Sequence, residues 1–173
     1  MNALFIGRFQ PFHLGHLSVI KKAVEAHDRL FIGIGSSEAN FQAANPFTCG
    51  ERFQMIEAAL NEARIPREKY EIVTIRNIDN FALWARHLEL YIPPFDRVYT
   101  GSDTVKYLFE DHNRNSKTTH EIISIKKELK ISGTSVREMM LKGGQWEILT
   151  PKSVAALINK WDGINRLKAV QGA

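Results

Sequence analysis

The amino-acid sequence predicts a doubly wound, Rossmann-like α/β fold, in which a parallel sheet of about five strands carries helices on both faces. Two observations predict this fold. Short apolar runs alternate along the chain with segments of helical period, and neither internal repeats nor low-complexity tracts interrupt them. The length of 173 residues suits one domain with a sizeable core. We therefore expect a single domain over residues 1–173, with a C-terminal helical segment at about 146–170 packed on it.

The strands are predicted where short apolar runs end in turn residues. They are expected at Ala3–Ile6, Leu30–Ile34, Glu71–Ile75, Arg97–Thr100 and Glu121–Ile125. Polar loops are expected over residues 38–48 and 111–119.

The helices are predicted from apolar residues that recur on one face and from capping residues at their ends. They are expected at Leu14–Ala26, Gly50–Ala63, Phe81–Leu90, from the Gly101-Ser102 turn through Phe109, from the Ile131–Thr134 turn to Leu141, and from Thr150 to about Trp161. Asn80 and Thr150 are the expected N-caps of two of them, with Pro151 in the first position of the last. Gly163 is expected to end that helix, and a short helix or a frayed tail follows.

Composition narrows the classes of function. A net charge of +4 and an isoelectric point of about 9.2 suit a phosphate-rich ligand. Basic residues do not form a block interleaved with aromatics, so we expect no nucleic-acid partner. Cys49 is the one cysteine, which excludes an internal disulfide and favours the reducing cytoplasm. No apolar run approaches the ~20 residues that span a bilayer, and we expect neither a membrane partner nor a signal peptide.

The first candidate site is the junction between the first strand and the first helix. Gly7 leaves room for a phosphate at the strand end, and Arg8 is the residue expected to grip an anion. His13 and His16 follow at the i,i+3 spacing that places both rings on one helix face. Beside the free N–H groups of a helix start, two such donors can stabilise charge on a phosphoryl group. The alternative is a surface turn with two solvated histidines.

The second candidate site is the hydroxyl-rich turn Ile131–Arg137, which contains Gly133. Ser132 and Thr134 stand where a helix start presents N–H donors. Arg137 falls in the first helical turn, where a cation opposes the helix dipole, and a bound phosphate would explain it. An ordinary Ser/Thr cap with an exposed arginine is the equal alternative.

Other residues have simpler interpretations. Trp84 is able to stack on a flat heterocycle and Asn80 to bind a sugar or amide, although packing in the core is the stronger interpretation of Trp84. Thr48 and Glu51 form a capping box. Arg52 is expected at the surface and Cys49 as a small residue near a helix start. Four further histidines show no metal-ligand spacing and are interpreted as surface or packing residues: His27, His87, His112 and His120.

These motifs together resemble a known family. The segment Gly7–His16 resembles the H-x-G-H signature of the nucleotidyltransferase α/β phosphodiesterase superfamily, and Ile131–Arg137 resembles its second signature, I-S-G-T-x-x-R. The Arg-Phe-Gln-Pro form of the first signature resembles the archaeal-type nicotinamide-mononucleotide adenylyltransferases. Asn45–Thr48, Glu51-Arg52, Ala82–Trp84 and Pro93–Tyr99 are similar to the same branch, so the resemblance covers nearly the whole chain.

The resemblance implies an enzyme that joins ATP and nicotinamide mononucleotide to give NAD and pyrophosphate by direct in-line attack. It implies that His13, His16, Arg8 and Arg137 act in catalysis. It implies that ATP is bound by Gly7, Arg8, Phe9, His13, His16, Ser132, Thr134 and Arg137. Mg²⁺ would arrive with ATP, held mostly by phosphate oxygens and water. Trp84, Asn80 and Ser36 would bind the mononucleotide, and a homo-oligomer is implied.

Four positions depart from the branch pattern: Asn77, Phe81, Ala44 and Ser102. They lie on the mononucleotide side or in the loop before the second helix, whereas the ATP side is intact. The same chemistry on nicotinic acid mononucleotide, FMN or another phosphorylated acceptor is therefore an alternative. A non-catalytic nucleotide sensor is a second alternative, although binding alone does not require both histidines.

Overall fold

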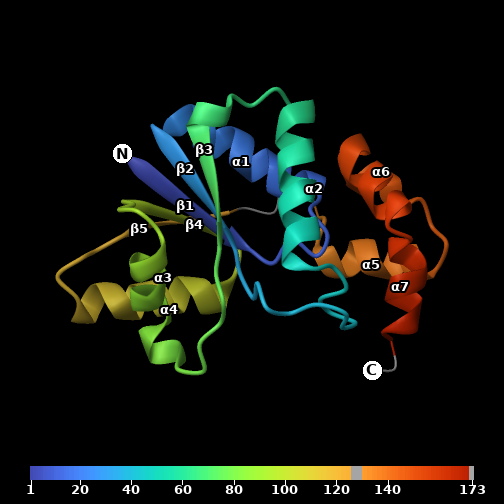
Figure 1. Cartoon of the computed structure of the whole chain (residues 1–173). Helices are drawn as coiled ribbons and strands as arrows, with labels where there is room; N and C mark the ends of the chain where they lie inside the picture. The colour runs from blue at the N-terminus through green and yellow to red at the C-terminus, as the bar shows by residue number, and fades with distance from the viewer. Residues whose placement is uncertain (126–129, 172–173) are drawn as a thin grey trace.

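A computed structural model describes residues 1–125 and 130–171. Its centre is a five-stranded sheet, in which every strand pair is parallel and the order is β3-β2-β1-β4-β5 (Figure 1). The strands are β1 (Asn2–Gly7), β2 (Arg29–Ile34), β3 (Tyr70–Thr74), β4 (Arg97–Thr100) and β5 (Glu121–Ser124). The chain winds outward from β1 in one direction to β3 and then returns to β4 and β5. This confirms the predicted doubly wound fold and puts its switch point between β1 and β4.

Helices cover both faces of the sheet (Figure 1). The α-helices are α1 (Leu14–Ala26), α2 (Cys49–Glu62), α3 (Trp84–Tyr91), α4 (Asp103–Asn115), α5 (Gly133–Leu141), α6 (Lys152–Lys160) and α7 (Gly163–Ala169). Short 3₁₀ turns are η1 (Arg67–Lys69), η2 (Phe81–Leu83) and η3 (Trp146–Leu149). Among the helices of the described residues, none is long and apolar enough to cross a membrane.

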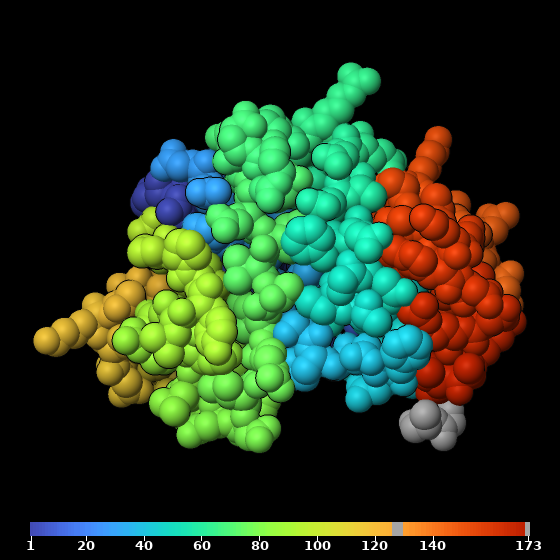
Figure 2. All heavy atoms as spheres, in the orientation of Figure 1, coloured from blue at the N-terminus to red at the C-terminus, as the bar shows by residue number. Residues whose placement is uncertain are grey.

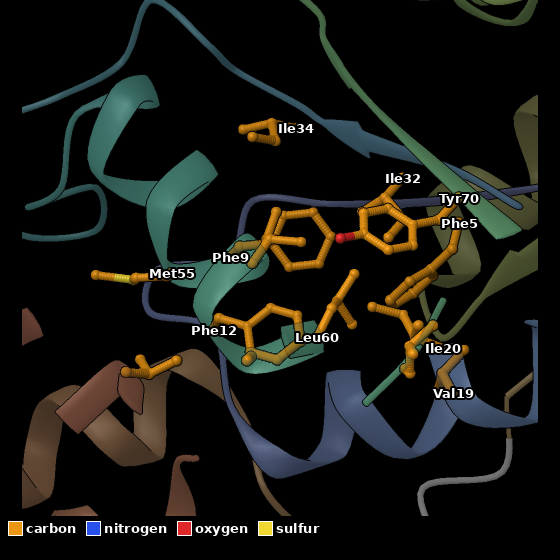
Figure 3. Packing of buried hydrophobic residues seen from close by; sticks show 14 of the residues in the cluster. Phe5, Phe9, Phe12, Val19, Ile20, Ile32, Ile34, Met55, Leu60 and Tyr70 are labelled. Carbon is orange, nitrogen blue, oxygen red and sulfur yellow. The ribbon is translucent and has the colours of Figure 1, made fainter. Parts of the chain in front are cut away.

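Alternation along the strands divides the core into two clusters. Phe5 and Ile32 point to the face covered by α1, α2 and the C-terminal helices, whereas Leu4 and Phe31 point to the face covered by α3 and α4. Figure 3 shows how the larger cluster fills the space between the sheet and helices, with the Phe9 and Phe12 rings side by side. The loop that carries the first motif is therefore anchored in the core.

Two predicted elements on the α3–α4 face were wrong in detail. The third helix opens as the 3₁₀ turn η2, and Asn80 caps that turn by accepting the N–H of Ala82. Helix α4 runs to Asn115, although a polar loop was predicted from Asp111. The polar residues of this last stretch bond within the helix, since Asp111 accepts from both Arg114 and Asn115, and so they lengthen it.

The C-terminal helices also begin differently from the prediction. Thr150 does not cap α6; its hydroxyl donates to the carbonyl of Glu147. The first free N–H groups of α6, at Lys152 and Ser153, donate instead to the carboxylate of Glu62 in α2. Helix α6 ends at Lys160, and Gly163, which was expected to end it, is the first residue of α7. Glycine suits this buried position, because a Cβ there would lie 3.0 Å from Ile158 and Phe47.

The C-terminal helices lie against α2 and the loop before it, where the red and cyan surfaces meet in Figure 2. Arg166 of α7 forms an ion pair with Glu51 of α2 at 2.6 Å, and its guanidinium lies over the Phe41 ring. Glu51 also completes the predicted capping box with Thr48. Because both charged groups are mostly buried, this contact fixes the C-terminal segment to the start of α2.

Candidate active site

A cavity of about 600 Å³ opens at the carboxyl ends of β1, β4 and β5. This position is the switch point of the sheet, where ligands bind in doubly wound folds. Both predicted phosphate motifs line it, and so do the residues that follow β4. From the sequence prediction these are Gly7, Arg8, Phe9, His13, His16, Ser132, Thr134 and Arg137. The structure therefore brings the whole predicted ATP set to one cavity.

His13 and His16 cap each other at the start of α1. The Nδ1 of His13 accepts the N–H of His16 at 3.4 Å, and the Nδ1 of His16 accepts the N–H of His13 at 3.2 Å. Each Nδ1 is thus an acceptor, so in the neutral ring the proton lies on Nε2. The two rings stack with centroids 3.6 Å apart. The pair therefore has two Nε2–H donors left for a ligand in the cavity.

Both histidines are neutral near pH 7. Burial lowers the pKa of His13 from 6.5 to about 4. Burial, followed by the proximity of His13, lowers the pKa of His16 well below 6.5. The surroundings explain this effect, because the ring of His16 packs against Phe9 and Phe12 at centroid distances of 4.8 and 5.4 Å. The histidines are therefore hydrogen-bond donors and not standing cations.

Small residues keep these rings in place. A Cβ on Gly15 would lie 3.0 Å from the ring of His13, and a Cβ on Gly7 would lie 3.1 Å from the ring of Phe9. Phe9 itself has a positive φ of 52° and is fully buried, so its ring serves as the wall against which His16 packs. Gly7 and Gly15 are thus required by close packing.

The second motif forms the start of α5. Ser132 caps the helix by accepting the N–H of Ser135. Arg137 reaches back across the cavity to donate to the carbonyl of Gln10 at 2.7 Å. A Cβ on Gly133 would lie 2.8 Å from that same carbonyl oxygen, so this position requires glycine. The close approach of Gly133 and the hydrogen bond from Arg137 both join the second motif to Gln10 of the first. Arg137 and Gln10 are 127 residues apart in the sequence.

Two arginines give the described lining of the cavity a positive charge. Arg8 and Arg137 line it, and the described lining residues include neither aspartate nor glutamate. The pKa of Arg137 is lowered first by burial and then by the charge of Arg8, although an arginine remains protonated. Arg8 is exposed, and its guanidinium donates a long hydrogen bond of 3.4 Å to the side chain of Asn45. A cavity with this charge favours an anion such as a polyphosphate.

Arg52 is the site residue whose role the sequence analysis missed. It was expected at the surface, but it is fully buried. Its guanidinium donates to the carbonyls of six residues, at distances of 2.9–3.4 Å: Arg8, Gly35, Ser36, Ser37, Ala39 and Thr48. Burial is the main reason that its pKa is lowered. The alternation of polar and apolar residues along α2 gives no sign of this, because carbonyl groups from other segments make the pocket.

Gln10 was also missed, although it lies between the two predicted histidines and Arg8. Its buried side chain exchanges two hydrogen bonds with the backbone of Phe47, at 2.8 and 2.9 Å. Its carbonyl accepts from Arg137. Gln10 therefore connects both phosphate motifs to the loop before α2, and only the folded arrangement could reveal this.

The residues predicted to bind the mononucleotide lie apart from the lining of the cavity. Ser36 follows Gly35, whose N–H donates to the carbonyl of Gly7 at 2.9 Å, so Ser36 is near the rim. The hydroxyl of Ser36 accepts from the Asn77 side chain at 2.9 Å. Trp84 is 8% exposed and packs edge-on against Phe109. Its packing agrees with the core interpretation given for it from the sequence.

Fold and cavity together define the nucleotidyltransferase class, and comparison with known proteins agrees. The model of the cytidylyltransferase-like family matches residues 4–139. Similar curated relatives are named nicotinamide-nucleotide adenylyltransferase. One, from Methanococcus vannielii, is 44% identical over 168 residues, which cover 97% of this chain and 94% of the relative. Another, from Archaeoglobus fulgidus, is 41% identical over 177 residues, which cover 99% of this chain and 98% of the relative. The chain belongs to the nicotinamide-nucleotide adenylyltransferases, and the resemblance seen in the sequence is confirmed.

Solved structures share the fold. A bifunctional NMN adenylyltransferase/ADP ribose pyrophosphatase from Francisella tularensis aligns with a TM-score of 0.77 at 24% identity. The alignment covers 97% of this chain and 52% of that one, so the chain spans about half of its length. The same protein complexed with AMP and a manganese ion aligns with a TM-score of 0.76.

The Arg52 contacts predict a large loss of stability on substitution. Arg52→Met would leave the buried carbonyls of Gly35 and Ser36 without their donor, and we expect the free energy of unfolding to fall by at least about 3 kcal/mol. Arg52→Lys keeps the positive charge but lacks the planar guanidinium, so we expect its free energy of unfolding to lie between those of the parent and Arg52→Met. Urea unfolding measures both, with the exposed Arg76→Met as control, expected within about 0.5 kcal/mol of the parent. A loss below about 1 kcal/mol for Arg52→Met would contradict this role.

The lowered pKa of His13 predicts a stability that depends on pH. Since the unfolded ring titrates near 6.5 and the folded ring near 4, the unfolded state binds more protons between these values. The contribution of His13 to stability should therefore decrease by about 2–3 kcal/mol as the pH falls from 6.5 to 4. His13→Asn keeps an N-cap acceptor and removes this dependence. The check is urea unfolding of both proteins at several pH values, and parallel curves would be the contrary result.

Proposed function

We propose that the cavity transfers the adenylyl group of ATP to nicotinamide mononucleotide. A phosphate oxygen of the mononucleotide attacks the α-phosphorus of ATP. The bond between that phosphorus and the α/β bridging oxygen breaks, so that NAD forms and pyrophosphate leaves with the bond's electron pair. One observation carries this proposal: the two mutually capped histidines, with Nε2–H groups left to donate, share with Arg137 and the start of α5 a cavity whose described lining has no carboxylate.

The residues of the cavity have distinct roles in this proposal. His13 and His16 donate from Nε2 to the bridging region of the triphosphate, where negative charge grows as pyrophosphate departs. Arg8 contacts the reacting phosphates. Ser132, Thr134 and Arg137 hold the β- and γ-phosphates at the start of α5, with Gly7 leaving the space and Phe9 positioning the ring of His16. Catalysis then rests on positioning and charge stabilisation, without a covalent intermediate.

Mg²⁺ enters this proposal as part of the substrate MgATP. The described lining residues have hydroxyl, amide and carbonyl oxygens but no carboxylate. Such a wall fits an ion that keeps water and phosphate oxygens as its ligands. The manganese ion bound with AMP in the Francisella tularensis structure supports the use of a divalent metal.

The mononucleotide is proposed to bind beside the cavity, near the end of β2. Ser36 lies at the rim of the cavity. The hydrogen bond from the Asn77 side chain to the Ser36 hydroxyl holds the segment that leads to Asn80 and Trp84 close to Ser36. The nicotinamide ring would stack on Trp84, and Asn80 and Ser36 would bind polar groups of the mononucleotide. Nicotinic acid mononucleotide, FMN and other phosphorylated acceptors remain the alternatives that the acceptor assay distinguishes.

The cellular setting and the assembly belong to the same proposal. We place the enzyme in the cytoplasm, because its single cysteine, Cys49, has no internal partner. We also propose a homo-oligomer, as the resemblance implies. Large exposed apolar side chains on η2 and α3 support it: Phe81, Leu83, Leu90 and Tyr91. Sedimentation velocity measures this, and a monomer at micromolar concentration would be the opposing result.

The first test is an assay with ATP, Mg²⁺ and a panel of acceptors, in which the dinucleotide and pyrophosphate are both followed. Nicotinamide mononucleotide should give NAD and pyrophosphate in equal amounts, and His16→Ala should lower kcat by about 10²–10³-fold with the mononucleotide KM nearly unchanged. His87→Ala, outside the cavity, is the control and should keep the parent kcat. Pyrophosphate release only with another acceptor would show that this acceptor, and not nicotinamide mononucleotide, is the substrate. No release with any acceptor would favour a nucleotide sensor.

The mononucleotide site makes a separate prediction. Trp84→Ala should raise the KM for nicotinamide mononucleotide by about 2–10-fold while the KM for ATP stays unchanged, because only the mononucleotide stacks on this ring. Steady-state kinetics of Trp84→Ala and of the better-packed Trp84→Phe measures this, with thermal unfolding to separate packing from binding. An unchanged KM in both variants would leave Trp84 with a packing role alone.

A further inference from the structure

A second cluster of metal-ligating side chains lies outside the cavity. Glu89 of α3, His112 of α4 and His120, the residue before β5, direct three ligand atoms to one point, all within 4.8 Å of one another. The Oε1 of Glu89 lies 2.9 Å from the Nε2 of His120 and 3.0 Å from the Nε2 of His112. The two histidines, expected to be scattered surface or packing residues, therefore meet. The cluster lies near the amino end of β5, whereas the cavity is at the carboxyl ends of the strands.

His120 is held in position before any ligand arrives. Its ring is almost fully buried and stacks on Phe95 at a centroid distance of 4.4 Å. Its backbone exchanges two hydrogen bonds with the Asn113 side chain, at 2.7 and 2.9 Å. Its Nδ1 lies 3.1 Å from the carbonyl oxygen of Phe95. Such a contact on the second ring nitrogen is the usual support of a metal-bound histidine.

His120 faces two acceptors. The carbonyl oxygen of Phe95 lies at Nδ1 and a carboxylate oxygen of Glu89 lies at Nε2, and both oxygens only accept. A neutral ring has one N–H, so it donates to one of them and turns a lone pair toward the other. With a cation between Nε2 and the Glu89 oxygen, Nδ1–H donates to Phe95 and the repulsive contact becomes two bonds to the cation.

The three side chains converge on one side of the carboxylate. The other carboxylate oxygen of Glu89 forms an ion pair with Arg86 at 2.7 Å, so Oε1 is the oxygen turned toward the two rings. His112 and His120 stack nearly parallel, with centroids 5.9 Å apart, and both Nε2 atoms face this oxygen. A single metal ion uses both neutral rings and the carboxylate at once.

We propose that Glu89, His112 and His120 bind one Zn²⁺ ion, with water as the fourth ligand. Two imidazoles and a carboxylate are a zinc ligand set, whereas the Mg²⁺ that accompanies ATP prefers oxygen ligands alone. Tetrahedral bonds of about 2.0–2.1 Å separate ligand atoms by about 3.3 Å. The two pairs that Glu89 forms with the histidines therefore need to open by only a few tenths of an ångström, and the two Nε2 atoms already lie within 4.8 Å of each other. The ion would join α3, α4 and the start of β5, far from the reacting phosphates, and its role would be structural.

The test is a Zn²⁺ titration of the full chain after treatment with EDTA and dialysis, in the absence of ATP. Isothermal calorimetry should show one equivalent of Zn²⁺ bound, and Co²⁺ should give the visible absorption of a four-coordinate site. His112→Gln and Glu89→Gln should weaken Zn²⁺ binding by at least about 100-fold. Excess Zn²⁺ should raise the Tm of the parent protein by about 5–10 °C and leave the Tm of these variants nearly unchanged.

Two variants control for other histidines. His87→Gln changes a histidine two residues before Glu89 on α3, and His13→Asn removes one ring of the stacked pair in the cavity. Both should bind Zn²⁺ as the parent does. The proposal is overturned if the parent binds no Zn²⁺, if His112→Gln binds it equally well, or if His13→Asn abolishes binding. The readout does not depend on adenylyl transfer, so it stands or fails separately from the proposed function.

Discussion

A buried guanidinium organises the edge of the sheet on which the active site depends. Arg52 supplies donors to carbonyl groups that follow β1 and β2, among them those of Arg8 and Gly35. Parallel strands end with carbonyls that have no partner in the next element, and leaving them buried and unpaired would be costly. The planar, permanently charged guanidinium of Arg52 donates to several of these carbonyls at once. The position of Arg8 at the cavity, and that of Ser36 at its rim, therefore follow from a side chain that is not itself part of the cavity lining.

The cavity is assembled by a few long-range contacts that act on short local motifs. The carbonyl of Gln10 accepts from Arg137, and the Gln10 side chain pairs with the backbone of Phe47. These bonds bring the start of α5 and the loop before α2 to the start of α1. The histidines cap each other within that frame, so they stay neutral and keep their Nε2–H groups for a ligand. Electrostatic preorganisation of this kind stabilises developing charge without reorganisation during the reaction.

The two edges of the sheet carry groups that favour ligands of opposite charge. The carboxyl edge gathers Arg8 and Arg137 around a cavity whose described lining has no acid, and an anionic ligand would balance that charge. At the amino edge, near the start of β5, Glu89 meets two imidazole rings whose lone pairs a cation would satisfy. Helix α4 connects both edges, because its N-cap Ser102 lines the cavity and Asn113 near its end bonds to His120. One segment of the fold thus links a site for anions to a cluster suited to a metal.

The sequence by itself determined the fold class, the bounds of α1 and β4, and the residues that meet at the cavity and that we predict to bind ATP. These depend on local features: the period of apolar residues, capping side chains, and glycine at a strand end, which act over a few residues. Arg52, Gln10 and the His112–His120 pair were decided only by the tertiary structure. Their partners are backbone groups and side chains from distant segments, and the burial that gives a polar group its role has no local signal. The start of α6 shows the same limit, since Glu62 of α2 caps it where Thr150 was expected.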